Sequence, residues 1–201
     1  MMQSLLFAVL VACPMLVAEP FSYWIEPCRS PASVCEQADE ELARWALEAW
    51  QRASNGSVVL SATPQEQARL RVYWASGRAG LYGEARRISV NGKVGAEVFV
   101  RPTLDGLGPE IAALGSKDPL FRHSIVYLTT LHELGHALGL PHTPNFTDIM
   151  YNFAFGGDIL EYFSRYRRAV RTRDGIPSVS GLSEEDVRRV RALYADSVRQ
   201  D

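Results

Sequence analysis

Hydrophobic residues recur at every second position in short segments of the first half of the chain. This alternation is typical of a β-strand that buries one face against a core. Asn91-Gly92 separates two such segments and is a strong signal for a two-residue β-hairpin turn. We predict strands over residues 21–26, 70–74, 81–90 and 94–100.

Elsewhere hydrophobic residues recur every three or four positions, which predicts amphipathic helices. Asp118 and Ser183 have side chains that cap the first turn of a helix, so each is a candidate N-cap. Glycine and proline punctuate residues 103–116, which we expect to form a loop. We predict helices over residues 36–52, 118–139 and 158–171, and a last one that begins at residue 183. This order of strands and helices predicts one α+β domain.

Five arginines lie close together in and after the third predicted helix. They are Arg165, Arg167, Arg168, Arg171 and Arg173. We expect them to form a solvated helix face, and a docking surface for an acidic substrate or a membrane is the alternative.

Composition limits the class of protein. The chain has 201 residues, of which 47% are hydrophobic and 22% are charged, as expected for one globular domain. A formal net charge of -2 and a pI near 6.1 argue against a nucleic-acid-binding protein. Beyond the amino terminus, no segment of the sequence is long and apolar enough to suggest a membrane span.

The amino terminus has the pattern of an export signal. A short apolar run is followed by small residues, and Ala18 is a candidate cleavage point. We therefore predict a signal peptide over residues 1–18 and a secreted or periplasmic domain over residues 19–201. The alternative is a lipoprotein signal over residues 1–12 with a lipid anchor at Cys13, because the preceding residues resemble a bacterial lipobox.

Whether Cys13 is removed with a signal peptide or carries a lipid, Cys28 and Cys35 are the two cysteines left to pair with each other. Two cysteines in an oxidising compartment are expected to form a disulfide, which here would close a small loop. Two unpaired thiols in a reducing cell are the alternative.

Three of the four histidines lie in the segment HELGHALGLPH. His132 and His136 are four residues apart, so a helix presents both on one face, one turn apart. Gly139 tolerates the left-handed conformation that ends a helix, and His142 can then return as a third ligand. Three neutral histidines leave the fourth position of a tetrahedral zinc ion open, as in catalytic zinc sites. Glu133 can reach a water in that position.

The same segment resembles the zinc signature of the metzincin endopeptidases. Residues 147–151 resemble their Met-turn, and the spacing from His142 to Met150 is similar to that of the matrixin branch. Residues 182–187 resemble the start of the matrixin carboxy-terminal helix, which implies a bond from Asp186 to the Met-turn backbone. The resemblance implies a metzincin-like zincin fold: a twisted mixed β-sheet with an active-site helix, a Met-turn and a C-terminal helix.

The resemblance also implies an activity. The expected function is a zinc-dependent endopeptidase that holds one catalytic Zn2+ and hydrolyses protein or peptide substrates as a monomer. Glu133 would act as general base and then general acid toward a zinc-activated water, with His132, His136 and His142 as metal ligands. The acidic calcium loops of animal matrixins are not found in the sequence, so a calcium site is not evident.

An extended substrate is implied to pair with an edge strand of the sheet. We place this edge strand at residues 95–100. The substrate-binding candidates on it are Gly95, Ala96, Glu97 and Val98.

Residues after the Met-turn are implied to wall the pocket beyond the scissile bond. Tyr151, Phe153 and Phe155 are the candidates, and packing in the core is the alternative for the two phenylalanines. The segment over residues 151–181 is longer than usual for a matrixin. If it covers the cleft, the alternative function is a zinc-binding, metzincin-fold binding or inhibitory module without significant turnover.

Overall fold

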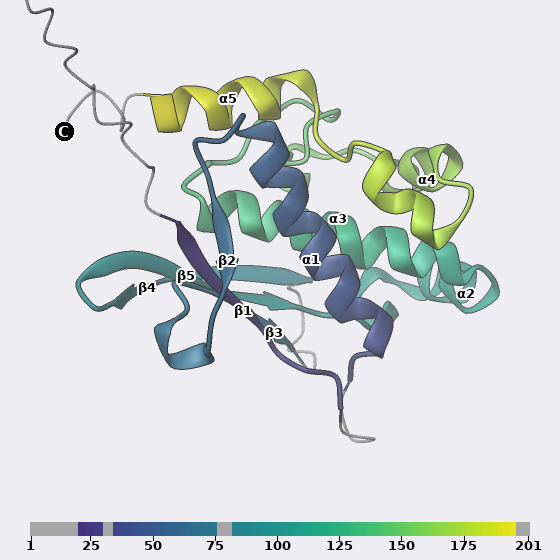
Figure 1. The fold of residues 1–201 in the computed structure, drawn as a ribbon. Helices are drawn as coiled ribbons and strands as arrows, with labels where there is room; N and C mark the ends of the chain where they lie inside the picture. Colours follow the sequence, from purple (N-terminus) through teal and green to yellow (C-terminus); the bar gives the residue numbers. More distant parts are fainter. Residues whose placement is uncertain (1–19, 30–33, 76–81, 196–201) are drawn as a thin grey trace, which may run out of the picture.

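A five-stranded mixed sheet with helices packed against one face makes up the fold in the computed structural model (Figure 1). The structure describes residues 20–29, 34–75 and 82–195. The predicted signal peptide and the alternative anchor at Cys13 lie outside the described residues. The predicted α+β class is confirmed, because the strands and helices form two packed layers.

The sheet has the strand order β2-β1-β3-β5-β4. The strands are β1 (Phe21–Ile25), β2 (Leu60–Ala62), β3 (Leu70–Trp74), β4 (Gly83–Val90) and β5 (Lys93–Val100). Neighbouring strands are parallel except for β4 and β5, which form an antiparallel hairpin. Asn91 and Gly92 in its turn both have positive φ, 52° and 77°, as a primed hairpin turn requires. The four predicted strands are therefore confirmed, whereas the short β2 was not predicted.

The strand expected to receive a substrate is an inner strand. β5 pairs with β3 along one edge and with β4 along the other. The main-chain groups of Gly95, Ala96, Glu97 and Val98 therefore face neighbouring strands, and the prediction that they lie on an edge is wrong. Within the described residues, the edge strand on this side is β4. A hairpin signal places two strands side by side, but it does not say which of them also pairs with β3.

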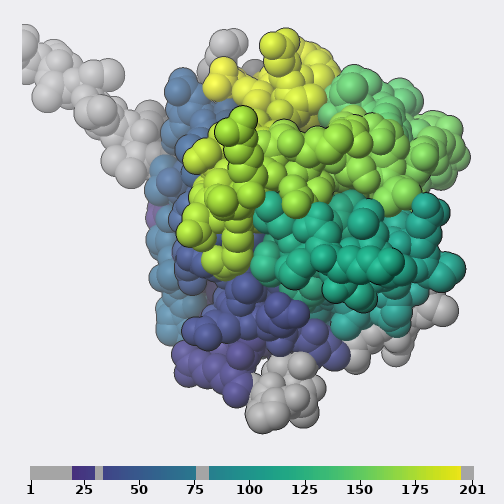
Figure 2. Space-filling view, turned by 90° about the vertical axis from the view of Figure 1, so that its right-hand side faces the viewer, coloured from purple at the N-terminus to yellow at the C-terminus, as the bar shows by residue number. Residues whose placement is uncertain are grey.

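Within the described residues, five α-helices accompany the sheet. They are α1 (Gln37–Ala53), α2 (Pro109–Lys117), α3 (Pro119–Ala137), α4 (Ile159–Ala169) and α5 (Glu184–Ala195). α3 lies at the centre, because it contacts α1, α2, α4 and the strands β4 and β5. The space-filling view shows α4 and the segment after it between α3 and α5 (Figure 2).

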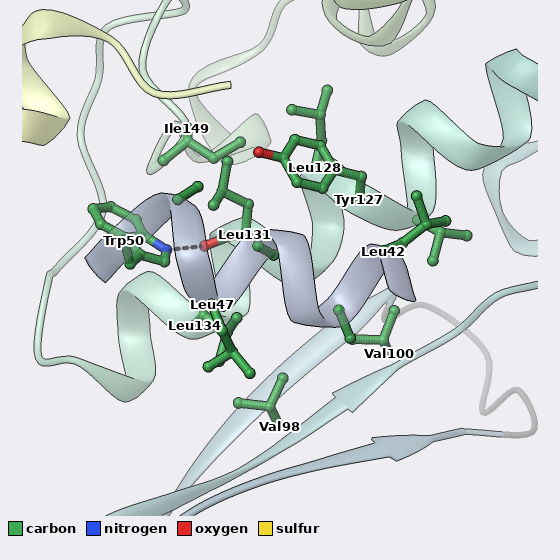
Figure 3. Packing of buried hydrophobic residues seen from close by; sticks show 14 of the residues in the cluster. Leu42, Leu47, Trp50, Val98, Val100, Tyr127, Leu128, Leu131, Leu134 and Ile149 are labelled. Atoms are coloured by element: carbon green, nitrogen blue, oxygen red, sulfur yellow. Dashed lines mark hydrogen bonds between the residues drawn. The ribbon is translucent and has the colours of Figure 1, made fainter. Parts of the chain in front are cut away.

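The core fills the space between α1, α3 and β5. Leu42, Leu47 and Trp50 of α1 meet Leu131 and Leu134 of α3 above the inward-facing valines of β5 (Figure 3). The Trp50 Nε1 donates a hydrogen bond to the Leu131 carbonyl at 2.8 Å. This contact anchors the helix that carries two of the candidate zinc ligands.

The loop predicted over residues 103–116 contains a helix instead, so that prediction is wrong. Pro109 begins α2, and Gly115 lies within it. A Cβ at Gly115 would lie 2.2 Å from Leu104 Cδ1. The glycine therefore permits close packing against Leu104 and does not mark a turn.

Cys28 and Cys35 form the predicted disulfide, with a Cα–Cα distance of 5.7 Å. It closes a short connection between β1 and α1. The Glu40 carboxylate of α1 accepts a hydrogen bond from the Cys28 backbone N–H at 2.7 Å. The disulfide and this hydrogen bond together fix the entry to α1.

In the described part of the chain, no helix combines the length and the hydropathy that a bilayer crossing needs.

Three of the five clustered arginines bind other parts of the protein, and the other two are exposed, so the expected solvated face is found only in part. Arg167 pairs with Asp118 at the start of α3, and Arg173 pairs with Glu41 of α1. Arg165 donates to backbone carbonyls. Arg168, paired with Glu161 on its own helix, and Arg171 keep the exposed position that we expected for the group. Arg165, Arg167 and Arg173 therefore attach α4 and the following segment to the domain.

Candidate metal centre and active-site cleft

α3 carries His132 and His136 and then ends so that the chain can return. Asp118 caps its first turn by accepting the backbone N–H groups of residues 120 and 121. Gly139 has a φ of 99° just after the helix, a conformation that favours glycine. The turn brings His142 back to the two helical histidines, as the sequence predicted.

The three imidazoles converge on one point. The His142 Nε2 lies 3.0 Å from the His136 Nε2 and 3.3 Å from the His132 Nε2. A zinc ion with nitrogen ligands at about 2.0–2.1 Å in tetrahedral geometry sets its ligand atoms about 3.3 Å apart. The spacing of these nitrogens therefore fits zinc.

Hydrogen bonds at the other ring nitrogen set the tautomer of two histidines. The His132 Nδ1 donates to the Ile149 carbonyl at 2.6 Å, and the His136 Nδ1 donates to the Leu140 carbonyl at 2.8 Å. Their Nε2 lone pairs consequently face the centre. Burial lowers the pKa of His132 to about 4 and lowers the pKa of His136 and His142 as well, which favours the neutral rings that bind metal.

Glu133 lies beside this centre and is 7% exposed. Burial, with a smaller contribution from the nearby Glu84, raises the pKa of the Glu133 carboxyl to about 8. Gly83 at the start of β4 permits its position, because a Cβ there would lie 2.5 Å from the Glu133 Oε1. The sequence contains no signal for this contact between the edge strand and the active-site helix.

Met150 lies fully buried beneath the histidine-bearing helix. The Met150 carbonyl accepts a hydrogen bond from the Thr143 backbone N–H at 2.8 Å, so the Met-turn is tied to the segment after His142. The Asp186 carboxylate of α5 accepts the Ile149 backbone N–H at 2.8 Å. The bond from Asp186 to the Met-turn, which the resemblance implied, is therefore present.

Replacing Gly135 with alanine is expected to lower the free energy of unfolding by about 1–3 kcal/mol, the usual cost of an overpacked core. A Cβ at Gly135 would lie 2.3 Å from the Met150 Sδ and 3.0 Å from the Trp50 Cζ2. Urea denaturation measures the loss. Gly175→Ala is the control, because its Cβ would make only an ordinary 3.4 Å contact with the Thr172 Oγ1. Equal stability of the two variants would contradict this packing account.

One cavity of about 540 Å³ joins the histidines to an apolar pocket. Tyr151 and Phe153 line it, whereas Phe155 is 62% exposed and belongs neither to the cavity wall nor to the core. The other aliphatic and aromatic lining residues, which sequence reasoning missed, are Tyr82, Leu107, Leu128, Ile159, Tyr162 and Phe163. Leu128 precedes His132 by one helical turn, so the helical period could have identified it.

α4 forms a wall of this cavity and leaves the histidines accessible. Ile159, Tyr162 and Phe163 are its contribution to the lining. His142 remains exposed, and His132 and His136 are partly exposed. The long segment after the Met-turn therefore shapes the cleft without covering the metal centre.

Comparison with known proteins adds one finding. The family model described as Matrixin matches residues 19–158, which is more than half of the chain. No curated protein matches the sequence. The matched range includes the three histidines, the adjacent glutamate and the Met-turn.

Proposed function

The chain belongs to the matrixin family, and from this we propose that it is a zinc-dependent endopeptidase that hydrolyses peptide bonds. The observation that carries the proposal is the convergence of three imidazole nitrogens beside a buried carboxylate in one open cavity. His132, His136 and His142 hold the zinc in this proposal, and Glu133 is the catalytic residue.

Each of these residues has a defined task. Zinc, when bound, supplies a Lewis acid that polarises the scissile carbonyl and acidifies a water molecule. Glu133 takes a proton from the attacking water and delivers it to the leaving amine. The carbonyls that accept from His132 and His136 hold those rings in the tautomer that binds metal.

The cleft also indicates how an extended peptide substrate would bind. An extended peptide can pair with the exposed edge of β4, in place of the β5 position that the sequence suggested. Its side chain after the scissile bond would enter the pocket between α3 and α4. Leu128, Phe153 and Ile159 make that pocket apolar, so we propose a preference for large apolar residues there.

A binding or inhibitory module is the alternative function. Its best support was the length of the segment over residues 151–181. The accessible histidines and the open cavity favour the enzyme, because an occluded cleft was the feature that would have favoured the module.

We also propose that the protein is exported from the cytoplasm. The Cys28–Cys35 disulfide supports an oxidising compartment. Both the predicted signal peptide and the alternative lipid anchor at Cys13 lead to export, so the disulfide is consistent with either.

Cleavage of a mixed peptide library by the zinc-loaded protein tests the function. We expect cleavage before large apolar residues, loss of cleavage with a chelator, and recovery when zinc is restored. The zinc content of the purified protein is measured alongside. A folded, zinc-loaded protein that cleaves none of the library would support the binding module instead.

A further inference from the structure

Two side chains of α4 bond to the loop that leads into Met150. The Tyr162 hydroxyl donates to the carbonyls of residues 148 and 149, at 3.0 and 3.4 Å. The Arg165 guanidinium donates to the carbonyls of residues 146 and 147, at 2.8 and 3.1 Å. Four consecutive carbonyls thus point at one helix, and their donors lie three residues apart on the same face of it.

The Tyr162 side chain is held in place by the rings and the guanidinium that pack around it. Tyr162 is 5% exposed, and the Arg165 guanidinium covers its ring at 4.6 Å. The rings that pack around Tyr162 are those of Phe146, Tyr151, Phe153 and Phe163. A side chain enclosed in this way cannot turn to water without losing its packing, so its hydroxyl direction is fixed by the fold.

One of the four carbonyls also accepts a hydrogen bond from a candidate zinc ligand. The Ile149 carbonyl accepts both the Tyr162 hydroxyl and the His132 Nδ1–H. The Ile149 N–H is held by Asp186. The position of this peptide unit therefore sets the orientation of the His132 ring.

We propose that α4 acts as a clamp on the loop over residues 146–149, so that Tyr162 and Arg165 are positioning residues for the zinc ligand His132. The match to the Matrixin model ends at residue 158, and α4 begins at Ile159. The clamp is thus supplied by a part of the chain beyond the matched range. The proposal that α4 positions His132 rests on the zinc site of the proposed function and does not depend on peptide hydrolysis.

Tyr162→Phe tests the clamp, because it removes the hydroxyl and keeps the ring. Groups that orient a metal ligand typically change metal affinity by about 10–100-fold. We expect about tenfold weaker zinc binding, at the low end of this range, since Tyr162 acts through a carbonyl. Competition with a chromophoric chelator measures the affinity. The absorption bands of the Co2+-substituted protein should also shift, because they report ligand geometry.

Arg165→Met tests the other half of the clamp. It keeps an unbranched side chain over the Tyr162 ring and removes the donors to residues 146 and 147. We expect weaker zinc binding and a shift of the Co2+ bands in the same direction as for Tyr162→Phe.

Tyr166→Phe is the matched control on the same helix. Tyr166 is 6% exposed, and its hydroxyl donates to the carbonyls of Ile176 and Val179, at 3.1 and 3.2 Å. Its hydroxyl contacts the segment after α4 and makes no bond to the loop over residues 146–149. This variant should lose comparable stability and keep the zinc affinity and Co2+ spectrum of the unmodified protein.

Two results would overturn the clamp. One is unchanged zinc affinity and an unchanged Co2+ spectrum in both folded clamp variants. The other is an equal loss of affinity in Tyr166→Phe, which would trace the effect to general stability. Because the readouts are metal affinity and spectrum, a protein that binds zinc as expected but cleaves no peptide would refute the proposed function and leave the clamp intact.

Discussion

Glu133→Ala is expected to lower kcat by about 10²–10⁴-fold, the usual contribution of a positioned general acid–base group. The side chain makes no contribution to the converging set of imidazole nitrogens. Zinc content should therefore remain that of the unmodified protein. Steady-state cleavage of a peptide identified in the library, with metal analysis of the same sample, measures both quantities.

Glu110→Ala is the control for this prediction, since Glu110 is an exposed glutamate on α2 outside the cleft. It should keep both its zinc and its kcat. Wild-type turnover by Glu133→Ala would remove the proposed role of the carboxylate. Loss of zinc in that variant would show instead that Glu133 supports the metal centre.

Trp50→Ala is expected to lower the free energy of unfolding by about 3–5 kcal/mol, the range measured for large aromatic deletions in cores. Trp50 is 1% exposed, and its Nε1 bonds to α3. Its ring also lies against Gly135, between the two helical histidines. Guanidinium denaturation of the zinc-loaded protein, followed by circular dichroism, measures the change.

Trp45→Ala provides a matched comparison on the same helix. Trp45 is only partly buried, and the Arg173 guanidinium lies 4.9 Å from its ring. Its removal leaves a smaller cavity, so the loss should be clearly smaller than for Trp50→Ala. If the two variants were equally stable, the contact between α1 and α3 would not be the main support of the active-site helix.

The convergence of the three candidate zinc ligands was predictable from sequence because its geometry is local. His132 and His136 are related by one helical turn, and Gly139 reverses the chain within a few residues to return His142. The strands were predictable for a similar reason, since alternation is a property of each segment alone. None of these inferences requires knowledge of which segments meet in the fold.

The errors concern contacts between distant segments. The hairpin signal could not show that β3 pairs with β5 and leaves β4 at the edge. Gly115 of α2 resembles a loop residue in the sequence, and only the fold shows that it packs against Leu104. The partners of Arg167 and Arg173 lie on α3 and α1, far away in sequence.

The groups that surround the three histidines could not be predicted from the sequence either. A backbone carbonyl such as that of Ile149 has no side-chain signature, yet it sets the orientation of His132. Tyr162 was not recognised as part of the cavity wall, because only the fold brings α4 beside α3.

The hydrogen bonds of Asp186 limit how far the chain can be shortened from its carboxy terminus. Its fully buried carboxylate accepts the backbone N–H groups of Ile149 and Ser183. A fragment trimmed at residue 158, where the family match stops, would retain every zinc-signature residue and still lack this acceptor. The Ile149 amide would then lose its buried partner, at a cost of roughly 1–3 kcal/mol. Expression boundaries for the folded domain should therefore extend through α5.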